Sequence, residues 1–142
     1  TAIGDEKDAK DYYDKASHYD QLWGRDNLHI GYYPHLSLNP SSSIELTPEQ
    51  AGIALTERMV RSSNIQSGDR VLDLGSGKGL ACAQIASLTG ASCVGIDRSP
   101  ENVARGRELA DQFPDLNLSY HEGSFTELPE FLLEGEGRYD VV

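Results

Sequence analysis

A glycine-rich turn preceded by an acidic residue is the segment of this sequence best suited to chemistry. Residues 71–79 read VLDLGSGKG, in which an apolar run leads into Gly75, Gly77 and Gly79. Glycine adopts positive φ without steric penalty and lets a ligand come close to the backbone. Where such a turn opens a helix, the free N–H groups of the helix face an anionic group. A nucleotide phosphate or an amino-acid carboxylate would serve equally well.

The spacing of the glycines distinguishes this turn from two other nucleotide-binding loops. Dinucleotide-binding loops favour G-x-G-x-x-G, and a P-loop needs GK followed by Ser or Thr after four intervening residues. Here the order is D-x-G-x-G-x-G, beginning at Asp73. A nicotinamide-dependent oxidoreductase is therefore the weaker alternative, because the third glycine stands one position early.

Two later segments place further candidate ligand-binding groups after predicted strands. Asp97 ends the apolar run 92–97, and its carboxylate can accept both hydroxyls of a ribose, as the acidic residue of nucleotide-binding Rossmann units does. Capping of the next helix is better assigned to Ser99. Residues 123–125, with the sequence GSF, follow the next predicted strand. They form a loop that can close over an adenine.

Alternating strand and helix signals position these loops. A capping box at Thr47-Pro48-Glu49-Gln50 opens a helix that is expected to end near Ser62. In the helix predicted over 79–88, the side chains of Ala81, Ile85 and Leu88 are expected to face the core. The alternating order predicts a parallel sheet with right-handed crossovers. Strands are predicted over 70–74, 92–97, 116–120 and 139–142, and helices over 79–88, 100–113 and 125–133.

The chain is predicted to have two parts. Residues 1–46 contain a helix over 8–23, followed by an aromatic segment and a loop rich in Ser, Asn and Pro. Residues 47–142 form the α/β domain, which is expected to be truncated in its fourth strand. A parallel strand buried on both faces needs helices on both sides, and an open edge invites pairing. A missing C-terminal half or an oligomer partner is therefore expected.

Composition narrows the classes of partner. The chain has 23 acidic residues against 12 Lys plus Arg, and its net charge of −11 repels phosphate backbones and anionic membranes. Nucleic acid is therefore not expected as a substrate, whereas a cationic ligand would be attracted. The sequence contains no apolar run of about 18 residues, so no membrane span is predicted.

The two cysteines indicate a reducing compartment. Cys82 and Cys93 lie in predicted core segments and are expected to be buried free thiols. No Cys/His cluster has zinc-ligand spacing, so no metal is predicted. The acidic opening of the chain is unlike a signal or transit peptide. A cytoplasmic location is expected, with an organelle reached after removal of a transit peptide as the alternative.

At these residues the chain resembles the class I S-adenosylmethionine-dependent methyltransferases, over residues 47–142. The resemblance implies a Rossmann-like three-layer αβα fold, of which the N-terminal half is present, with S-adenosyl-L-methionine as the cofactor. It also implies that the methionine end lies against the turn, the ribose on Asp97 and the adenine beside the loop after the third strand. Many family members have an acid where Ser124 stands. The cofactor-binding residues implied are Asp73, Gly75, Ser76, Gly77, Gly79, Asp97, Arg98, Ser124 and Phe125.

The front of the chain is rich in aromatic residues. Its pattern WG…HxGYY, formed by Trp23, His29, Tyr32 and Tyr33, resembles that of a subgroup of small-molecule methyltransferases, in which this segment folds over the cofactor as a lid. The subgroup includes sarcosine/dimethylglycine N-methyltransferases and tocopherol-type enzymes, and more distantly the sterol and cyclopropane-fatty-acid enzymes. Aromatic rings attract ammonium groups but also pack prenylated phenols. His29, which can take a proton near neutral pH, and Tyr32 are the catalytic candidates.

The sequence thus predicts a methyltransferase that uses S-adenosylmethionine and acts on a small molecule. N-methylation of a glycine derivative is the first hypothesis, and C- or O-methylation of a prenylated phenol or other lipid-like substrate is the alternative. A nicotinamide-dependent oxidoreductase and a non-catalytic nucleotide-binding domain remain as readings from other classes. The residues that contact the substrate are expected to lie largely beyond residue 142.

Overall fold

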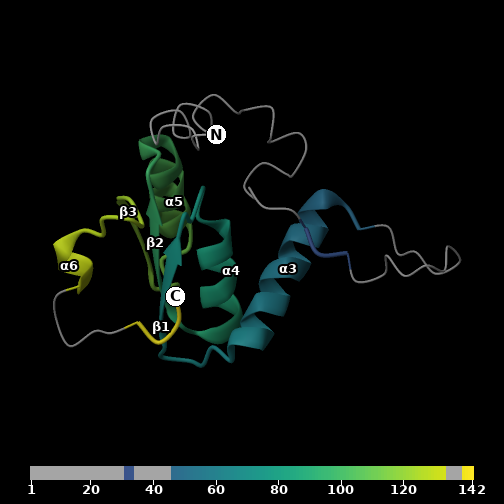
Figure 1. The fold of residues 1–142 in the computed structure, drawn as a ribbon. Helices are drawn as coiled ribbons and strands as arrows, with labels where there is room; N and C mark the ends of the chain where they lie inside the picture. The colour runs from purple at the N-terminus through teal and green to yellow at the C-terminus, as the bar shows by residue number, and fades with distance from the viewer. Residues whose placement is uncertain (1–30, 34–45, 134–138) are drawn as a thin grey trace, which may run out of the picture.

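A computed structural model of the chain describes residues 31–33, 46–133 and 139–142. Its described strands form one parallel sheet in the order β1-β2-β3, and helices alternate with them along the chain (Figure 1). This arrangement confirms the predicted α/β fold with a parallel sheet. The elements are α3 (Pro48–Ser63), β1 (Arg70–Leu74), α4 (Leu80–Thr89), β2 (Ser92–Asp97), α5 (Pro100–Gln112), β3 (Leu118–Glu122) and α6 (Glu130–Leu133).

Local capping signals determine where two of the helices begin. The Thr47 side chain accepts a hydrogen bond from the Gln50 amide at 3.2 Å, and the Gln50 side chain accepts one from the Thr47 amide at 2.9 Å. The Ser99 hydroxyl likewise accepts from the Asn102 amide at 3.3 Å at the start of α5. Each contact satisfies an amide that the first helical turn leaves without a partner. Both predicted caps are therefore confirmed.

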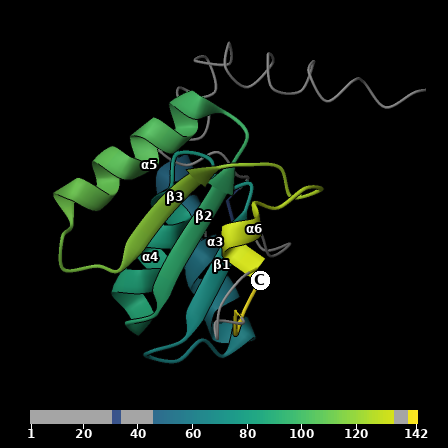
Figure 2. The same cartoon turned by 90° about the vertical axis from the view of Figure 1, so that its left-hand side faces the viewer.

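The two faces of the sheet carry separate apolar clusters. Helices α3, α4 and α5 lie on one side and α6 lies on the other (Figures 1 and 2). Successive strand residues point to opposite faces, so Val71 joins the cluster towards α4 and α5, whereas Leu72 packs with Ile96 and Leu132. Helices therefore cover both faces of the described sheet.

The two cysteines are both buried and free in the first of these clusters, as expected. Burial, together with the nearby Asp73 carboxylate, raises the pKa of Cys93 to about 12. Burial also raises the pKa of Cys82, with the same carboxylate adding to the effect. Both thiols therefore stay protonated and unreactive near neutral pH.

Three details of the sequence prediction were wrong. Leu88 is 54% exposed, because α4 buries Cys82, Ala83, Ile85 and Ala86 instead. The third strand begins at Leu118 rather than at 116, since the Leu118 amide turns back to bond the Leu116 carbonyl at 3.1 Å. The helix predicted over 125–133 is confined to α6, because a tight turn occupies 124–127.

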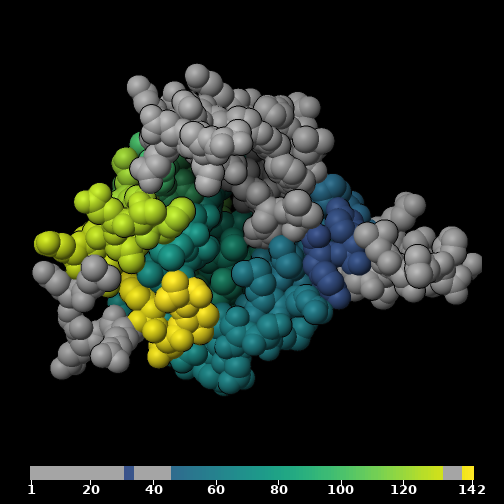
Figure 3. Space-filling view, viewed as in Figure 1, coloured from purple at the N-terminus to yellow at the C-terminus, as the bar shows by residue number. Residues whose placement is uncertain are grey.

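The end of the chain lies beside β1. Val141 forms an isolated parallel bridge with Val71, and its carbonyl accepts the Leu72 amide at 2.9 Å. The predicted fourth strand is thus present as one bridge, in the expected parallel direction, at the surface visible in Figure 3. The predicted helix over 8–23 lies outside the described residues. None of the described helices combines the length and apolar character needed to cross a bilayer.

Candidate cofactor site

The loops that follow the three strands are joined at the carboxyl edge of the sheet. The Ile96 carbonyl, near the end of β2, accepts hydrogen bonds from the amides of Gly75 and Ser76, at 2.8 and 3.0 Å. The Asp97 carbonyl accepts the Gly123 amide at 3.0 Å. In open parallel sheets, ligands bind outside this edge. The sequence-predicted groups therefore come together where such a fold places its site.

All three glycines of the turn after β1 have the conformation expected from the sequence. Their φ angles are +82° at Gly75, +54° at Gly77 and +88° at Gly79, in the region that L-residues avoid. Gly79 is the N-cap of α4 and provides no side-chain cap. Among the residues that the structure describes, no atom lies within 4 Å of a Cβ added at Gly75. The backbone is thus open to a ligand on this side of the turn.

Asp97 connects the turn to the end of β2. Its Oδ2 accepts the Gly77 amide at 2.8 Å, and its Oδ1 accepts the Ser99 amide at 2.9 Å and the Asn102 side chain at 3.2 Å. An ionised carboxylate offers about four acceptor positions. The structure therefore leaves room for one further hydroxyl at Oδ2. The sequence predicts that this carboxylate accepts both ribose hydroxyls, and that role stays a prediction.

Asp73 lies near the end of β1, beside the buried thiols. The Cys82 thiol donates to Asp73 Oδ2 at 3.4 Å. In the strand register Asp73 is opposite Gly95 of β2, so no side chain from that position separates the carboxylate from the core. Asp73 is therefore half-buried, at the edge of the core and close to the start of α4.

The loop after β3 uses the Ser124 side chain within its own turn. Ser124 Oγ lies 2.7 Å from Thr126 Oγ1 and accepts the Thr126 amide at 3.2 Å. Its hydroxyl is thus engaged within the loop itself. Phe125 is 63% exposed next to it, and Arg98 directly follows Asp97. These positions are compatible with an adenine border, a role that stays a prediction.

Of the aromatic front segment, the structure describes only Gly31, Tyr32 and Tyr33. The Tyr32 amide donates to the Ala51 carbonyl at 2.8 Å, and its hydroxyl accepts from Arg58 Nη1 at 3.2 Å. The Arg58 guanidinium also lies 4.7 Å from the centre of the Tyr32 ring. Tyr32 is therefore packed against α3, while Tyr33 is at the surface. Trp23 and His29 lie outside the described residues, so the lid and the catalytic candidates stay predictions.

Sequence reasoning missed Tyr120, which the structure places directly beneath the turn. The sequence predicts Tyr120 only as an alternating residue of the third strand. Its buried hydroxyl donates to the Gly79 carbonyl at 2.8 Å. Gly106, inside α5, was the available signal, because a glycine in a helix interior is unfavourable by about 1 kcal/mol relative to alanine unless close packing requires it.

Among the described residues, no group of three His, Cys, Asp or Glu side chains could hold a metal ion.

The fold and the turn define a Rossmann-like αβα domain with a glycine loop at the start of a helix. The profile of a methyltransferase domain family matches residues 65–142. The chain belongs to this methyltransferase domain family.

Curated relatives agree with this assignment. The chain is 32% identical over 130 residues to Methyltransferase GfsG of Streptomyces halstedii, covering 84% of this chain and 45% of that protein. It is 31% identical over 137 residues to the sarcosine/dimethylglycine N-methyltransferase of Aphanothece halophytica, covering 87% and 43%. It is 30% identical over 111 residues to the chloroplastic tocopherol O-methyltransferase of Arabidopsis thaliana, covering 72% and 30%. The chain thus spans less than half the length of each.

Solved structures show the same fold. The [4+2]-cyclase SpnF matches with a TM-score of 0.71 at 21% identity, over 85% of this chain and 43% of that one. A putative sarcosine dimethylglycine methyltransferase from Galdieria sulphuraria matches with a TM-score of 0.64 at 24% identity, over 83% and 44%. An RNA methyltransferase from Salinibacter ruber, in complex with S-adenosyl-L-homocysteine, matches with a TM-score of 0.50 at 29% identity, over 59% and 53%.

Replacing Asp97 with alanine tests whether the carboxylate at the end of β2 belongs to the cofactor site. We expect Asp97→Ala in the full-length protein to weaken binding of S-adenosylhomocysteine by about 1–3 kcal/mol, because a ribose hydroxyl and the Gly77 amide both lose their acceptor. Titration calorimetry measures the change. Asn102→Ala is the matched control, since it removes one contact to Asp97 and keeps the carboxylate. Unchanged affinity in Asp97→Ala would exclude Asp97 from the site.

Proposed function

We propose that the full-length protein transfers a methyl group from S-adenosylmethionine to a small molecule. The observation that carries this proposal is the turn after β1, which has three glycines at positive φ, Asp73 before it, and the Asp97 carboxylate bonded to its Gly77 amide. The complex of the Salinibacter ruber relative with S-adenosyl-L-homocysteine supports the choice of cofactor. Fold similarity to the cyclase SpnF does not weaken it, because a fold does not fix the reaction.

The residues present fit this cofactor. The open space above Gly75 admits a ligand against the backbone, and the N-terminus of α4 favours an anionic group such as the methionine carboxylate. To Asp73, half-buried close to the start of α4, we assign the attraction of the ammonium group of the methionine end. Asp97 retains an acceptor position for a ribose hydroxyl. The cofactor, when bound, supplies an already activated methyl group on its sulfonium.

The chain's own contribution is then mainly positioning. Holding donor and acceptor in line without water contributes up to about 7–11 kcal/mol in favourable cases. The hydrogen bonds from Gly75 and Ser76 to the Ile96 carbonyl, and from Gly77 to Asp97, fix the turn to β2. The binding surface is thus already organised in the ligand-free protein, which reduces the ordering cost of binding.

For the methyl acceptor we propose an amine of the glycine-derivative class. The aromatic residues of the front segment can stabilise an ammonium group, and the net charge of −11 favours cations. Similarity to sarcosine/dimethylglycine N-methyltransferase supports this proposal. Similarity to tocopherol O-methyltransferase supports the alternative, a prenylated phenol methylated on oxygen or carbon.

Binding and turnover of the full-length protein test the proposal in two steps. Calorimetry should detect S-adenosylhomocysteine binding and no binding of NAD. Transfer of labelled methyl from S-adenosylmethionine should then occur with sarcosine or dimethylglycine and not with prenylated phenols. Turnover of the phenols alone would select the alternative acceptor, and binding of NAD alone would overturn the assignment of the cofactor.

A further inference from the structure

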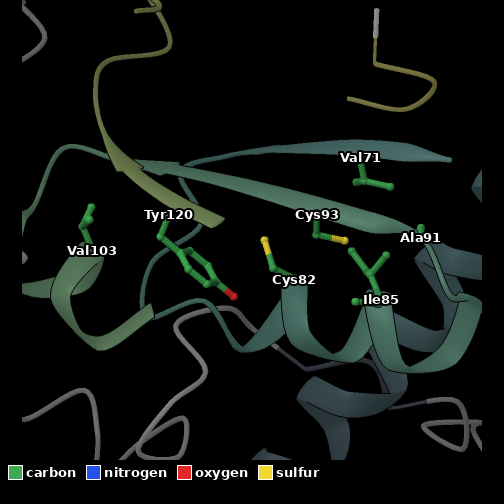
Figure 4. Close-up of a cluster of buried hydrophobic side chains, with 8 residues drawn as sticks. Val71, Cys82, Ile85, Ala91, Cys93, Val103 and Tyr120 are labelled. Carbon is green, nitrogen blue, oxygen red and sulfur yellow. The ribbon is translucent and has the colours of Figure 1, made fainter. Parts of the chain in front are cut away.

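Tyr120 connects β3 to the glycine turn through the core. Its side chain is 2% exposed, and its hydroxyl donates to the Gly79 carbonyl at 2.8 Å. Figure 4 shows the ring pointing from β3 towards the start of α4, next to Cys82. Burial raises the pKa of Tyr120 far above its usual value. The phenol therefore stays protonated near neutral pH and remains a hydrogen-bond donor.

Three glycines from three elements make the space for this ring. A Cβ added at Gly79 before α4, at Gly95 in β2 or at Gly106 in α5 would come within 2.6, 2.6 and 2.7 Å of Tyr120 ring atoms. Contacts this short do not occur between real side chains. The ring is thus held from several sides, and its hydroxyl has little freedom to move.

The bond from Tyr120 ends on an atom that defines the start of α4. The Gly79 carbonyl also accepts the Ala83 amide at 3.2 Å, the first helical hydrogen bond of α4. The phenol therefore fixes both the left-handed Gly79 and the first turn of the helix. The strand register places Asp73 opposite Gly95, and Gly95 opposite Tyr120. Tyr120 thus lies at the same level across the sheet as Asp73, the residue proposed to meet the methionine end.

We propose that Tyr120 is a positioning residue of the cofactor site, whose phenol holds the glycine turn in the shape that receives the methionine end of S-adenosylmethionine. This inference rests on the proposed function for the identity of the ligand. It predicts an effect confined to one end of that ligand, because the ribose and adenine groups are assigned to Asp97 and to the loop after β3.

The test compares two ligands on the Tyr120→Phe variant of the full-length protein, which keeps the ring and removes only the hydroxyl. We expect the dissociation constant of S-adenosylhomocysteine to rise about 3- to 10-fold, because binding must then order the turn that the phenol holds in the ligand-free parent protein. The dissociation constant of adenosine, which lacks the methionine end, should change by less than about twofold. Equal losses for both ligands, or no loss for either, would overturn the proposal.

The matched control is Tyr139→Phe. Tyr139 is half-buried and packs against the apolar cluster on the opposite face of the sheet. Removing its hydroxyl should leave both dissociation constants unchanged. A loss of S-adenosylhomocysteine binding in this control would mean that any tyrosine-to-phenylalanine change weakens the site, and the assignment to Tyr120 would fail.

Hydrogen–deuterium exchange of the ligand-free protein separates this inference from the proposed function. Peptides covering residues 79–83, at the start of α4, should exchange several-fold faster in Tyr120→Phe than in the parent protein, and at the parent rate in Tyr139→Phe. Unchanged exchange in this segment would overturn the positioning role whatever the ligand is. If the parent protein binds neither nucleoside ligand, the proposed function fails, and the exchange result still decides whether Tyr120 holds the turn.

Discussion

Gly79→Ala should destabilise the ligand-free protein far more than Gly75→Ala, although both glycines have nearly the same backbone conformation. Their φ angles are +88° and +82°, so alanine costs about 1–2 kcal/mol at either position. At Gly79 the new Cβ also meets Tyr120 ring atoms at 2.6–2.8 Å, whereas at Gly75 it meets nothing within 4 Å. Overpacking adds about 1–3 kcal/mol. The expected losses are therefore about 2–5 kcal/mol for Gly79→Ala and about 1–2 for Gly75→Ala.

Urea denaturation in the absence of cofactor measures this difference. The Tyr120 ring cannot move aside cheaply, because the backbone at Gly95 and Gly106 lies so close that an added Cβ would come within 2.6–2.7 Å of the ring. Its hydroxyl is also bonded to Gly79 itself. Gly75→Ala serves as the control for backbone strain. Equal free energies of unfolding for the two variants would show that the ring yields, and that the packing around Tyr120 is looser than the structure indicates.

Features set by local chemistry could be predicted from the sequence. The positive φ angles of the turn follow from the run of glycines after an apolar strand, and the caps of α3 and α5 follow from residues within one helical turn. The position of Asp97 at the end of β2 also follows, because alternating elements leave little choice of sheet edge. These signals lie within a few residues of the features that they predict.

Features that depend on contacts between distant elements could not be predicted in this way. The role of Tyr120 requires that β2, α4 and α5 all approach one ring, which no window of the sequence contains. The exposure of Leu88 follows from which side of α4 meets the sheet and α3. The engagement of the Ser124 hydroxyl with Thr126 depends on a turn whose geometry short polar runs do not specify.

The Asp97 carboxylate accepts hydrogen bonds from groups within the protein, and these depend on contacts between separate elements. Two of its partners, Ser99 and Asn102, belong to the start of α5. The third, the Gly77 amide, belongs to the turn after β1. The carboxylate therefore helps to build the site and keeps one position for a ligand. A disturbance at Gly77 should consequently affect the ribose end and the methionine end together.

Gly77→Val should abolish measurable cofactor binding and leave the fold largely intact. Gly77 has φ +54°, a conformation in which a β-branched residue is a clear outlier. The variant turn is expected to relax to negative φ and to break the bond from the Gly77 amide to Asp97. Losing this bond and the shape of the turn should reduce the binding free energy of the cofactor by about 3 kcal/mol or more, which is a loss of at least roughly 100-fold in affinity. Calorimetry with S-adenosylhomocysteine and circular dichroism should be measured on the same sample.

Gly77→Asn separates the two ways in which valine can act, by backbone strain or by filling the ligand's space. Asparagine is among the residues that most readily adopt left-handed φ, so this variant should keep the turn and its bond to Asp97. If the ligand lies directly against the turn, the asparagine side chain still occupies its space and binding is lost in both variants. If only the backbone shape matters, asparagine retains binding within about tenfold, a loss of about 1.4 kcal/mol. A folded Gly77→Val protein that binds S-adenosylhomocysteine as tightly as the parent would show that the ligand does not approach this turn.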